Sequence, residues 1–246
     1  FGTGSTVSGT LEIGAGGFIS TAPPTGFYGS NAILKFNQGA SATYNVNSSD
    51  NSWSTDVVPN YITISSGTVN LNANRTATGN LLIDGGALVL KDASSINLTI
   101  NGNWTRTSGT FTANDATVTL SGTTNTIIDA TGGATLYNLA VSKTEGAKVT
   151  LGSNLTISNT MSISNGAIFE VSAGKALTVT GALTNNAGAG GLVVKSGSSL
   201  ISSNGVAATV ERFLTKYVAA GDKMFHFISS PVNVQPIRPE FVSDAA

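Results

Sequence analysis

Apolar residues alternate with polar residues over short stretches along most of the chain. The clearest region spans residues 136–200, where Leu155, Ile157, Met161 and Ile163 are separated by Thr, Ser and Asn. A period of two places successive side chains on opposite faces of a strand, so each stretch predicts a short β-strand with one apolar face. Asn, Gly and Ser separate the stretches, and these residues favour turns.

The same apolar-polar-apolar triplet recurs at similar intervals along the whole chain. From Leu11 to a last start at Leu200, the average step is about 21 residues. A repeat of roughly 20 to 50 residues is typical of solenoids, propellers and arrays. The triplets are Leu11–Ile13, Leu34–Phe36, Ile62–Ile64, Leu81–Ile83, Leu98–Ile100, Val118–Leu120, Leu139–Val141, Leu155–Ile157 and Leu177–Val179.

Only one repeat architecture fits this step. A leucine-rich repeat needs a helical segment in each unit, and a propeller blade needs about 40 residues. No stretch here has useful helical periodicity, and Gly, Ser, Thr and Asn are poor helix formers. The sequence therefore predicts an all-β fold, a parallel β-helix (β-solenoid) of about ten coils. We expect it to be right-handed, because parallel crossover connections are almost always right-handed.

The pattern changes near the end of the chain. We expect the parallel β-helix to span residues 1–205, and residues 206–246 to form a short C-terminal β cap or the beginning of a further β-domain. That last segment holds the only histidine, His226, and bulkier strands than the repeats. A cap covers the open edge of the last coil and prevents end-to-end aggregation.

Composition excludes several classes of function. Charged residues make up 10% of the chain and its net charge is −1, whereas nucleic-acid binding needs clustered Lys and Arg. The absence of cysteine excludes disulfides and thiolate metal sites. No apolar run approaches a membrane span of about 20 residues. We therefore expect no nucleic-acid partner, no membrane insertion, no metal and no cofactor, in a protein secreted from or displayed on a bacterial cell.

The longest step between triplets contains an insertion with candidate ligand-binding residues. Between Asn45 and Pro59, Trp53 lies close to Asp50 and Asp56. A tryptophan ring stacks on a sugar ring while carboxylates accept hydrogen bonds from its hydroxyls, so these residues predict a carbohydrate contact. The alternative is that Trp53 folds down as a hydrophobic plug over the edge of a coil. The Asp and Asn spacing does not match an EF-hand loop.

A second tryptophan suggests a related surface. Trp104 lies two residues before Arg106, and we expect both on the outside of the coil as a further carbohydrate contact. Together with Trp53, Tyr28 and Tyr137, it would support a carbohydrate-binding module if the rings form a row on one solvent face. Scattered or buried rings would oppose that function.

The end of the chain resembles a known group of proteins. Residues 208–214, Ala-Thr-Val-Glu-Arg-Phe-Leu, and residues 223–232, Lys-Met-Phe-His-Phe-Ile-Ser-Ser-Pro-Val, are similar to segments of large secreted and cell-surface β-helical repeat proteins of Bacteroidetes. This resemblance implies an adhesin or cell-surface fibre exported by the type IX secretion system. It also implies that the chain is part of a longer protein. It supplies no catalytic or binding residues.

These observations favour a structural or adhesive extracellular module of a bacterial surface protein or filament, without catalysis. Its expected partners are a second copy, end to end, and a glycan or other ligand at a host or cell surface. The alternative is a carbohydrate-binding or polysaccharide-degrading β-helix, a lyase or hydrolase. Against degradation, the single His226 lies outside the repeats and no Arg-x-Lys triplet occurs.

Overall fold

The structure, a computed structural model, describes residues 4–91, 95–144 and 146–212. The predicted C-terminal cap or further domain lies outside the described residues from residue 213 onward, and so does His226. The solenoid predicted for residues 1–205 falls almost entirely within them.

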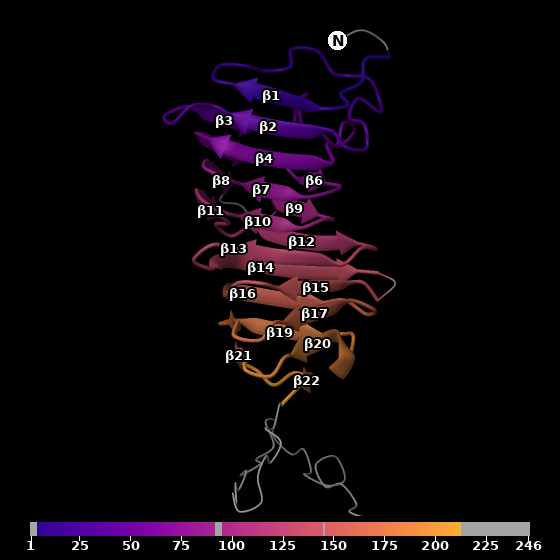
Figure 1. The fold of residues 1–246 in the computed structure, drawn as a ribbon, viewed down its shortest axis with the longest axis vertical. Helices are drawn as coiled ribbons and strands as arrows, with labels where there is room; N and C mark the ends of the chain where they lie inside the picture. The colour runs from indigo at the N-terminus through magenta and orange to yellow at the C-terminus, as the bar shows by residue number, and fades with distance from the viewer. Residues whose placement is uncertain (1–3, 92–94, 145, 213–246) are drawn as a thin grey trace, which may run out of the picture.

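The described chain is a column of stacked coils, with the strands lying across its long axis (Figure 1). It is all-β, its strand pairs are parallel, and it forms a β-solenoid of about nine turns, so the predicted fold class is confirmed. In this part of the chain the helical structure is the 3₁₀ turn η1 (Ala189–Gly191). No helix within it has the length and hydropathy needed to cross a membrane.

Within the described residues the strands form three sheets that run along the column. The ten-stranded sheet contains β1 (Thr10–Gly14), β2 (Ile33–Asn37), β4 (Tyr61–Ser66), β7 (Leu81–Ile83), β10 (Trp104–Arg106), β13 (Thr126–Ala130), β15 (Lys148–Leu151), β17 (Ile168–Val171), β20 (Leu192–Val194) and β22 (Thr209–Val210). The four-stranded sheet contains β3 (Thr43–Val46), β5 (Thr68–Leu71), β8 (Ala87–Leu90) and β11 (Thr110–Thr112). The eight-stranded sheet contains β6 (Arg75–Ala77), β9 (Asn97–Ile100), β12 (Thr117–Gly122), β14 (Ala134–Lys143), β16 (Leu155–Ile163), β18 (Ala176–Val179), β19 (Ala182–Asn185) and β21 (Ser199–Ser202).

The ten-stranded sheet has one strand per coil, which sets the length of the column. Its ten strands define nine steps. At about 4.8 Å per step, these span about 43 Å. The right-handed sense of the coil stays a prediction.

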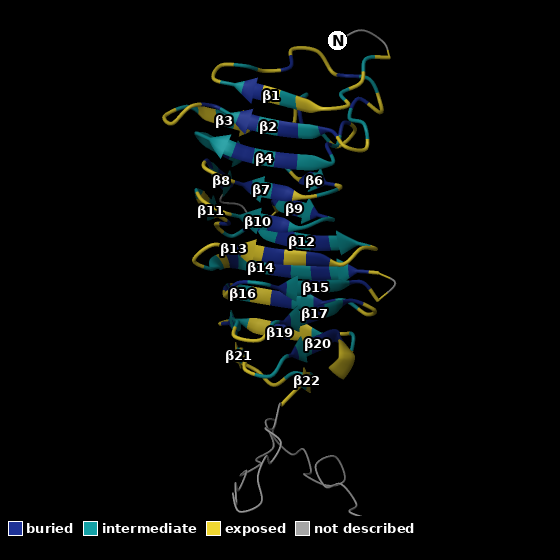
Figure 2. Ribbon diagram, in the orientation of Figure 1, coloured by how far each residue is buried: buried dark blue, intermediate teal, exposed yellow. Residues whose placement is uncertain are grey.

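The core is built from inward side chains that stack in columns from coil to coil. In the ten-stranded sheet Leu34, Ile62 and Leu81 occupy equivalent positions, followed by Trp104 and Ile128. All five side chains are buried. Figure 2 shows buried positions along the strands, with exposed positions at the turns and on the outer side of some strands. This stacking explains the alternation in the sequence, because each strand buries every second residue against the coils above and below.

The cross-section of the solenoid changes after β11. The coils that begin with β4, β7 and β10 each have three separate strands, as in the coil formed by β7, β8 and β9. In the next two coils one long strand, β14 or β16, takes the place of the second and third strands, which are separate again as β18 and β19. The second half of β14, from Asn138, pairs with β12 and its first half, Ala134–Leu136, pairs with β16. Within the described residues the first half of β14 has no strand partner on the side of β11, which ends the four-stranded sheet.

The outer surfaces of the sheets differ in charge. On the ten-stranded sheet, Glu170 pairs with Lys148 at 3.0 Å and with Lys195 at 3.5 Å, and Lys195 also pairs with Glu211 at 2.6 Å. On the four-stranded sheet, outward asparagines bond to one another instead, as Asn70 Nδ2 does to Asn45 Oδ1 at 2.9 Å. Neighbouring coils are therefore joined by side chains as well as by the backbone ladder.

Candidate functional site

The insertion predicted to bind a ligand is organised by Asp50. Its Oδ1 accepts hydrogen bonds from the backbone N–H and the hydroxyl of Ser52 at 2.9 and 2.6 Å, and from the backbone N–H of Trp53 at 3.0 Å. Its Oδ2 accepts the Tyr44 hydroxyl at 2.6 Å. Four donors within the protein thus occupy this carboxylate, which holds the loop in shape.

Trp53 is fully buried beneath the same insertion. Its indole Nε1 donates to the backbone oxygen of Thr76 at 2.7 Å. Thr76 belongs to β6, the terminal strand of the eight-stranded sheet. Trp53 therefore covers the open edge of this strand and supplies a hydrogen-bond donor to one of its backbone oxygens. The predicted stacking of a sugar on Trp53 is not supported, because the ring has no exposed face. The alternative interpretation, a plug over a coil edge, describes what the structure shows.

The remaining predicted contacts are also not assembled into one site. Asp56 is exposed, and its backbone N–H donates to the Ser54 hydroxyl at 3.3 Å. Trp104 lies inside the coil between Leu81 and Ile128, so the expectation that it lies outside is wrong. It follows the same alternation as the Leu and Ile residues of its column.

The two candidate tyrosines, Tyr28 and Tyr137, do not form a row with the tryptophans. Tyr28 is half-buried, and its hydroxyl donates to the backbone oxygen of Ser52 at 2.6 Å. Burial, with the nearby Asp50 charge, raises the pKa of Tyr28. Tyr137 is half-buried on the eight-stranded sheet, far along the column from the insertion. The four candidate aromatic rings are therefore scattered or buried, and no aromatic row is formed.

The structure instead reveals a groove where the four-stranded sheet ends. Two adjoining hollows of about 410 and 220 Å³ lie between β11 and the first half of β14, and both are lined by Phe111 and Thr135. We call this feature the inter-coil groove. It is lined by Arg106, Thr110, Phe111, Thr112, Ala113, Asn114, Gly132, Gly133, Ala134, Thr135, Leu136, Tyr137, Asn154, Thr156 and Ser158.

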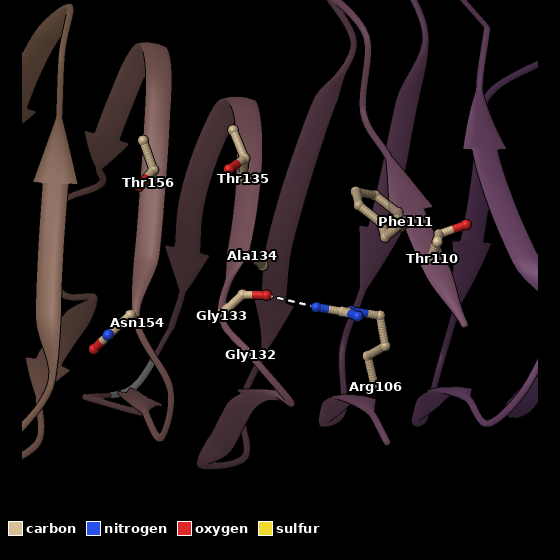
Figure 3. A pocket seen from close by; sticks show the side chains of 9 residues that line it. All are labelled: Arg106, Thr110, Phe111, Gly132, Gly133, Ala134, Thr135, Asn154 and Thr156. Carbon is tan, nitrogen blue, oxygen red and sulfur yellow. Dashed lines mark hydrogen bonds between the residues drawn. The ribbon is translucent and has the colours of Figure 1, made fainter. Parts of the chain in front are cut away.

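Figure 3 shows how the side chains of the larger hollow are arranged. Thr135 and Thr156 lie on neighbouring strands of one wall, and Phe111 lies on the other wall. Arg106 extends from the base of the groove toward Gly133. From Gly133 to Tyr137, the groove is about 13 Å long at about 3.3 Å per residue.

Backbone groups also face this groove. The backbone N–H of Thr110 points toward β8, where it donates to the backbone oxygen of Gly86. The backbone N–H of Ala134 points toward β16, where it donates to the backbone oxygen of Asn154. In a parallel ladder, the backbone N–H and C=O of one residue point to one side of the strand, and those of the next residue point to the other side. The N–H and C=O groups of Phe111 and Thr135 therefore point into the groove from its two walls.

Arg106 supplies the positive charge of the groove. Its Nη1 donates to the backbone oxygen of Gly109 at 3.1 Å, and its Nη2 donates to those of Thr131 and Gly133 at 2.9 and 2.5 Å. None of the ion pairs found among the described residues includes Arg106. Its guanidinium thus joins the corners of two coils while its charge has no carboxylate partner there.

The buried Trp104 supports the wall of the groove from below. Its ring packs against that of Phe111 with centroids 4.9 Å apart and an angle of 59° between the planes. Phe111 is only half-buried, so part of its ring faces the groove. The residue predicted to contact a ligand thus holds a different aromatic ring in place beside the groove.

A buried lysine lies at a corner of the coil outside the groove. Lys143 is fully buried, and its Nζ donates to the backbone oxygens of Asn101 at 2.9 Å and Ser121 at 2.5 Å. Burial lowers the pKa of Lys143 to about 8. The described residues hold no cluster of three or more His, Cys, Asp or Glu side chains.

The fold places the chain in the class of parallel β-solenoids, and the inter-coil groove lies where its four-stranded sheet ends. Comparison with protein families, curated proteins and solved structures gave no match.

Proposed function

We propose that this chain is a stiff structural module, a stalk or adhesive segment of a bacterial cell-surface protein or extracellular filament, and that it does not act as a catalyst. The observation that carries this proposal is the ten-stranded sheet, which continues from β1 to β22 through parallel pairs. Hydrogen bonds along such a ladder connect every coil to the next, so the described chain behaves as one rigid column.

The location outside a bacterial cell rests on sequence features. The chain is poor in charge and free of cysteine, and residues 208–214 and 223–232 resemble segments of secreted Bacteroidetes surface proteins. Export by the type IX secretion system belongs to the same proposal. A test is to express the full-length gene product in its native host and to label intact cells with an antibody against this chain. Labelling that requires lysis of the cells contradicts the proposed location.

The stalk function is tested by the shape of the purified chain. Small-angle X-ray scattering should give the profile of an elongated particle, whose described part is about 43 Å long. A globular profile would contradict a column-like stalk. Turnover of any polysaccharide by the purified chain, measured as released reducing ends, would contradict the absence of catalysis.

A filament is one form of this function. Within the described residues, β1 and β22 each pair with one strand only, so each leaves one strand edge available. Free edges of this kind promote pairing between molecules. Electron microscopy of the native protein distinguishes the two forms, because end-to-end association gives long fibres and a single stalk gives isolated short rods.

Carbohydrate binding is a second candidate, favoured by the inter-coil groove. Threonine hydroxyls, an asparagine amide, an arginine and a partly exposed phenylalanine line its larger hollow. Such a mixture of polar groups around an aromatic ring suits a polyhydroxylated ligand. A glycan-binding screen with the purified chain tests this candidate, and an adhesive stalk needs a ligand of this kind.

A further inference from the structure

We propose that the inter-coil groove binds a linear oligosaccharide that carries carboxylate groups, with Arg106 holding a carboxylate and Phe111 contacting a sugar ring. This inference rests on the adhesive form of the proposed function and names its ligand. The juxtaposition that carries it is a break in the backbone ladder flanked by an arginine that has no carboxylate partner among the described residues.

The width of the groove argues against a peptide ligand. A strand inserted between β11 and β14 would need two inter-strand spacings, about 9.6 Å in total. Cα atoms of β11 and β14 approach within 8 Å of each other. The gap is therefore too narrow for another strand that pairs with both walls, although β11 and β14 do not pair with each other.

The backbone groups that face the groove can form hydrogen bonds with hydroxyl groups of a ligand. Both walls present backbone N–H donors and C=O acceptors, at Phe111 and Thr135. A sugar hydroxyl donates and accepts at the same time, so one hydroxyl satisfies groups of either kind. Side chains of Thr110, Thr156 and Asn154 add further polar groups. Because buried or half-buried polar groups need partners, a ligand rich in hydroxyls fits these walls better than an apolar one.

The charge of the groove selects among sugars. The Arg106 guanidinium has five N–H donors, and three hydrogen bonds to backbone oxygens are present. Carboxylates form the strongest hydrogen bonds with guanidinium groups. The nearest wall residues of the larger hollow are uncharged. A uronate carboxylate at the base of the groove would therefore meet a positive charge with no competing acid in the lining.

The test uses two forms of one polymer. Oligogalacturonate and its methyl ester have the same sugars and length, but only the first is charged. Isothermal titration calorimetry with the complete chain should show binding of the acid form and binding at least about tenfold weaker for the ester, the range expected for a charged hydrogen bond. Equal binding of both forms, or binding of neither, overturns the proposed ligand class.

Two variants locate the site. Thr135→Trp fills the groove from an exposed position and should abolish binding, while Thr178→Trp provides the control, because Thr178 lies two strands further along the same outward column. Arg106→Gln should weaken binding of the acid form about tenfold and leave the ester unchanged. Lys35→Gln makes the same charge change on the ten-stranded sheet and should have no effect.

The outcomes separate this inference from the proposed function. Unchanged binding in Thr135→Trp, with the melting temperature of wild type, would place the ligand elsewhere and overturn the groove as its site. Binding of an extended peptide that Thr135→Trp blocks would also overturn the inference. In each of these cases an elongated scattering profile would leave the stalk function standing, whereas a globular profile would remove the stalk itself.

Discussion

Two glycines with the same left-handed backbone have very different surroundings. Gly109 has φ of +68°, and a Cβ built there would lie 2.0 Å from the backbone oxygen of Gly86 in the preceding coil. Gly166 has φ of +80°, and nothing lies within 4 Å of its Cβ position. Gly109 is therefore needed for both its conformation and the close approach of two coils, and Gly166 for its conformation alone.

This difference predicts two sizes of effect from the same substitution. Gly166→Ala should lower the free energy of unfolding by about 1 kcal/mol, the cost of a left-handed conformation for a residue with Cβ. Gly109→Ala should cost about 3 kcal/mol or more, because the coil corners must also move apart. Urea denaturation measures both values. An equal decrease in the free energy of unfolding in both variants would show that the corner before β11 accommodates a Cβ next to the Gly86 oxygen.

Lys143 makes the stability of the solenoid depend on pH. Burial lowers its pKa from 10.5 to about 8 in the folded protein. Between these values the unfolded chain binds more protons than the folded one, so stability rises as pH increases through this window. The pKa values of Tyr28 and Tyr44 are raised by burial, and their effect, opposite in sign, sets in as the pH approaches their ordinary pKa of 10.0.

We therefore expect the free energy of unfolding to rise by about 1 kcal/mol from pH 8 to pH 10, because the two tyrosines offset part of the contribution of Lys143. The Lys143→Met variant, which has no titrating group at this corner, should lose that rise. Urea denaturation at several pH values measures both slopes. A wild-type protein whose stability is flat over this range would show that the Lys143 ammonium is accommodated without an energetic penalty.

At the scale of the element, the insertion between Asn45 and Pro59 protects a strand edge. Trp53→Phe keeps most of the buried ring but removes the hydrogen bond to Thr76, and should lower stability by about 2 kcal/mol. Hydrogen exchange of the β6 amides should become faster in this variant. Asp56→Ala, at an exposed position of the same insertion, should change stability by less than about 0.5 kcal/mol. If the two variants behave alike, Trp53 does not stabilise the edge.

Most strands could be predicted because inward and outward residues alternate in each of them. What could not be predicted is the face to which each triplet belongs. The triplets from Leu11 to Ile83 lie in the ten-stranded sheet, whereas those from Leu98 onward lie in the eight-stranded sheet. The pattern is the same on every face of the coil, so a switch of face leaves the apparent repeat length almost unchanged.

The candidate site was less predictable for a related reason. The inter-coil groove depends on the relation between Phe111 and Thr135, which are a full coil apart in the sequence and do not pair. A weak signal is present, because residues 134–143 contain no glycine and form one continuous strand, as residues 155–163 also do. The sequence did not distinguish the two positions that Trp53 and Trp104 could take, because an aromatic ring that can stack on a sugar can equally be buried in a hydrophobic core.

At the scale of the whole molecule, contacts are made mainly between neighbouring coils. Leu151 and Val171 occupy equivalent positions in β15 and β17. Deleting residues 151–170 puts Val171 in the position of Leu151 and removes one coil. We expect this shortened chain to fold, with a single cooperative melting transition and the far-ultraviolet spectrum of a β-protein, because each coil interacts only with its neighbours.

A slightly longer deletion provides the control. Removing residues 151–171 instead puts Ser172 in the inward position of Leu151 and shortens the turn before β18 by one residue. That variant should melt at a lower temperature than the 151–170 deletion, because a hydroxyl replaces a buried apolar side chain. If both deletions are equally stable, the inward position at this point does not contribute to the stability of the column.

The unpaired step between β11 and β14 has a mechanical consequence. Between the coil of β7 and the coil of β10, hydrogen bonds join all three faces, through β7–β10, β8–β11 and β9–β12. At the next step they join only two, through β10–β13 and β12–β14. This step therefore has no strand-to-strand hydrogen bonds on the face that carries the groove, and a load on that face is not shared by a backbone ladder there. A bound ligand that bridges the two walls would restore a connection on this face and stiffen the joint.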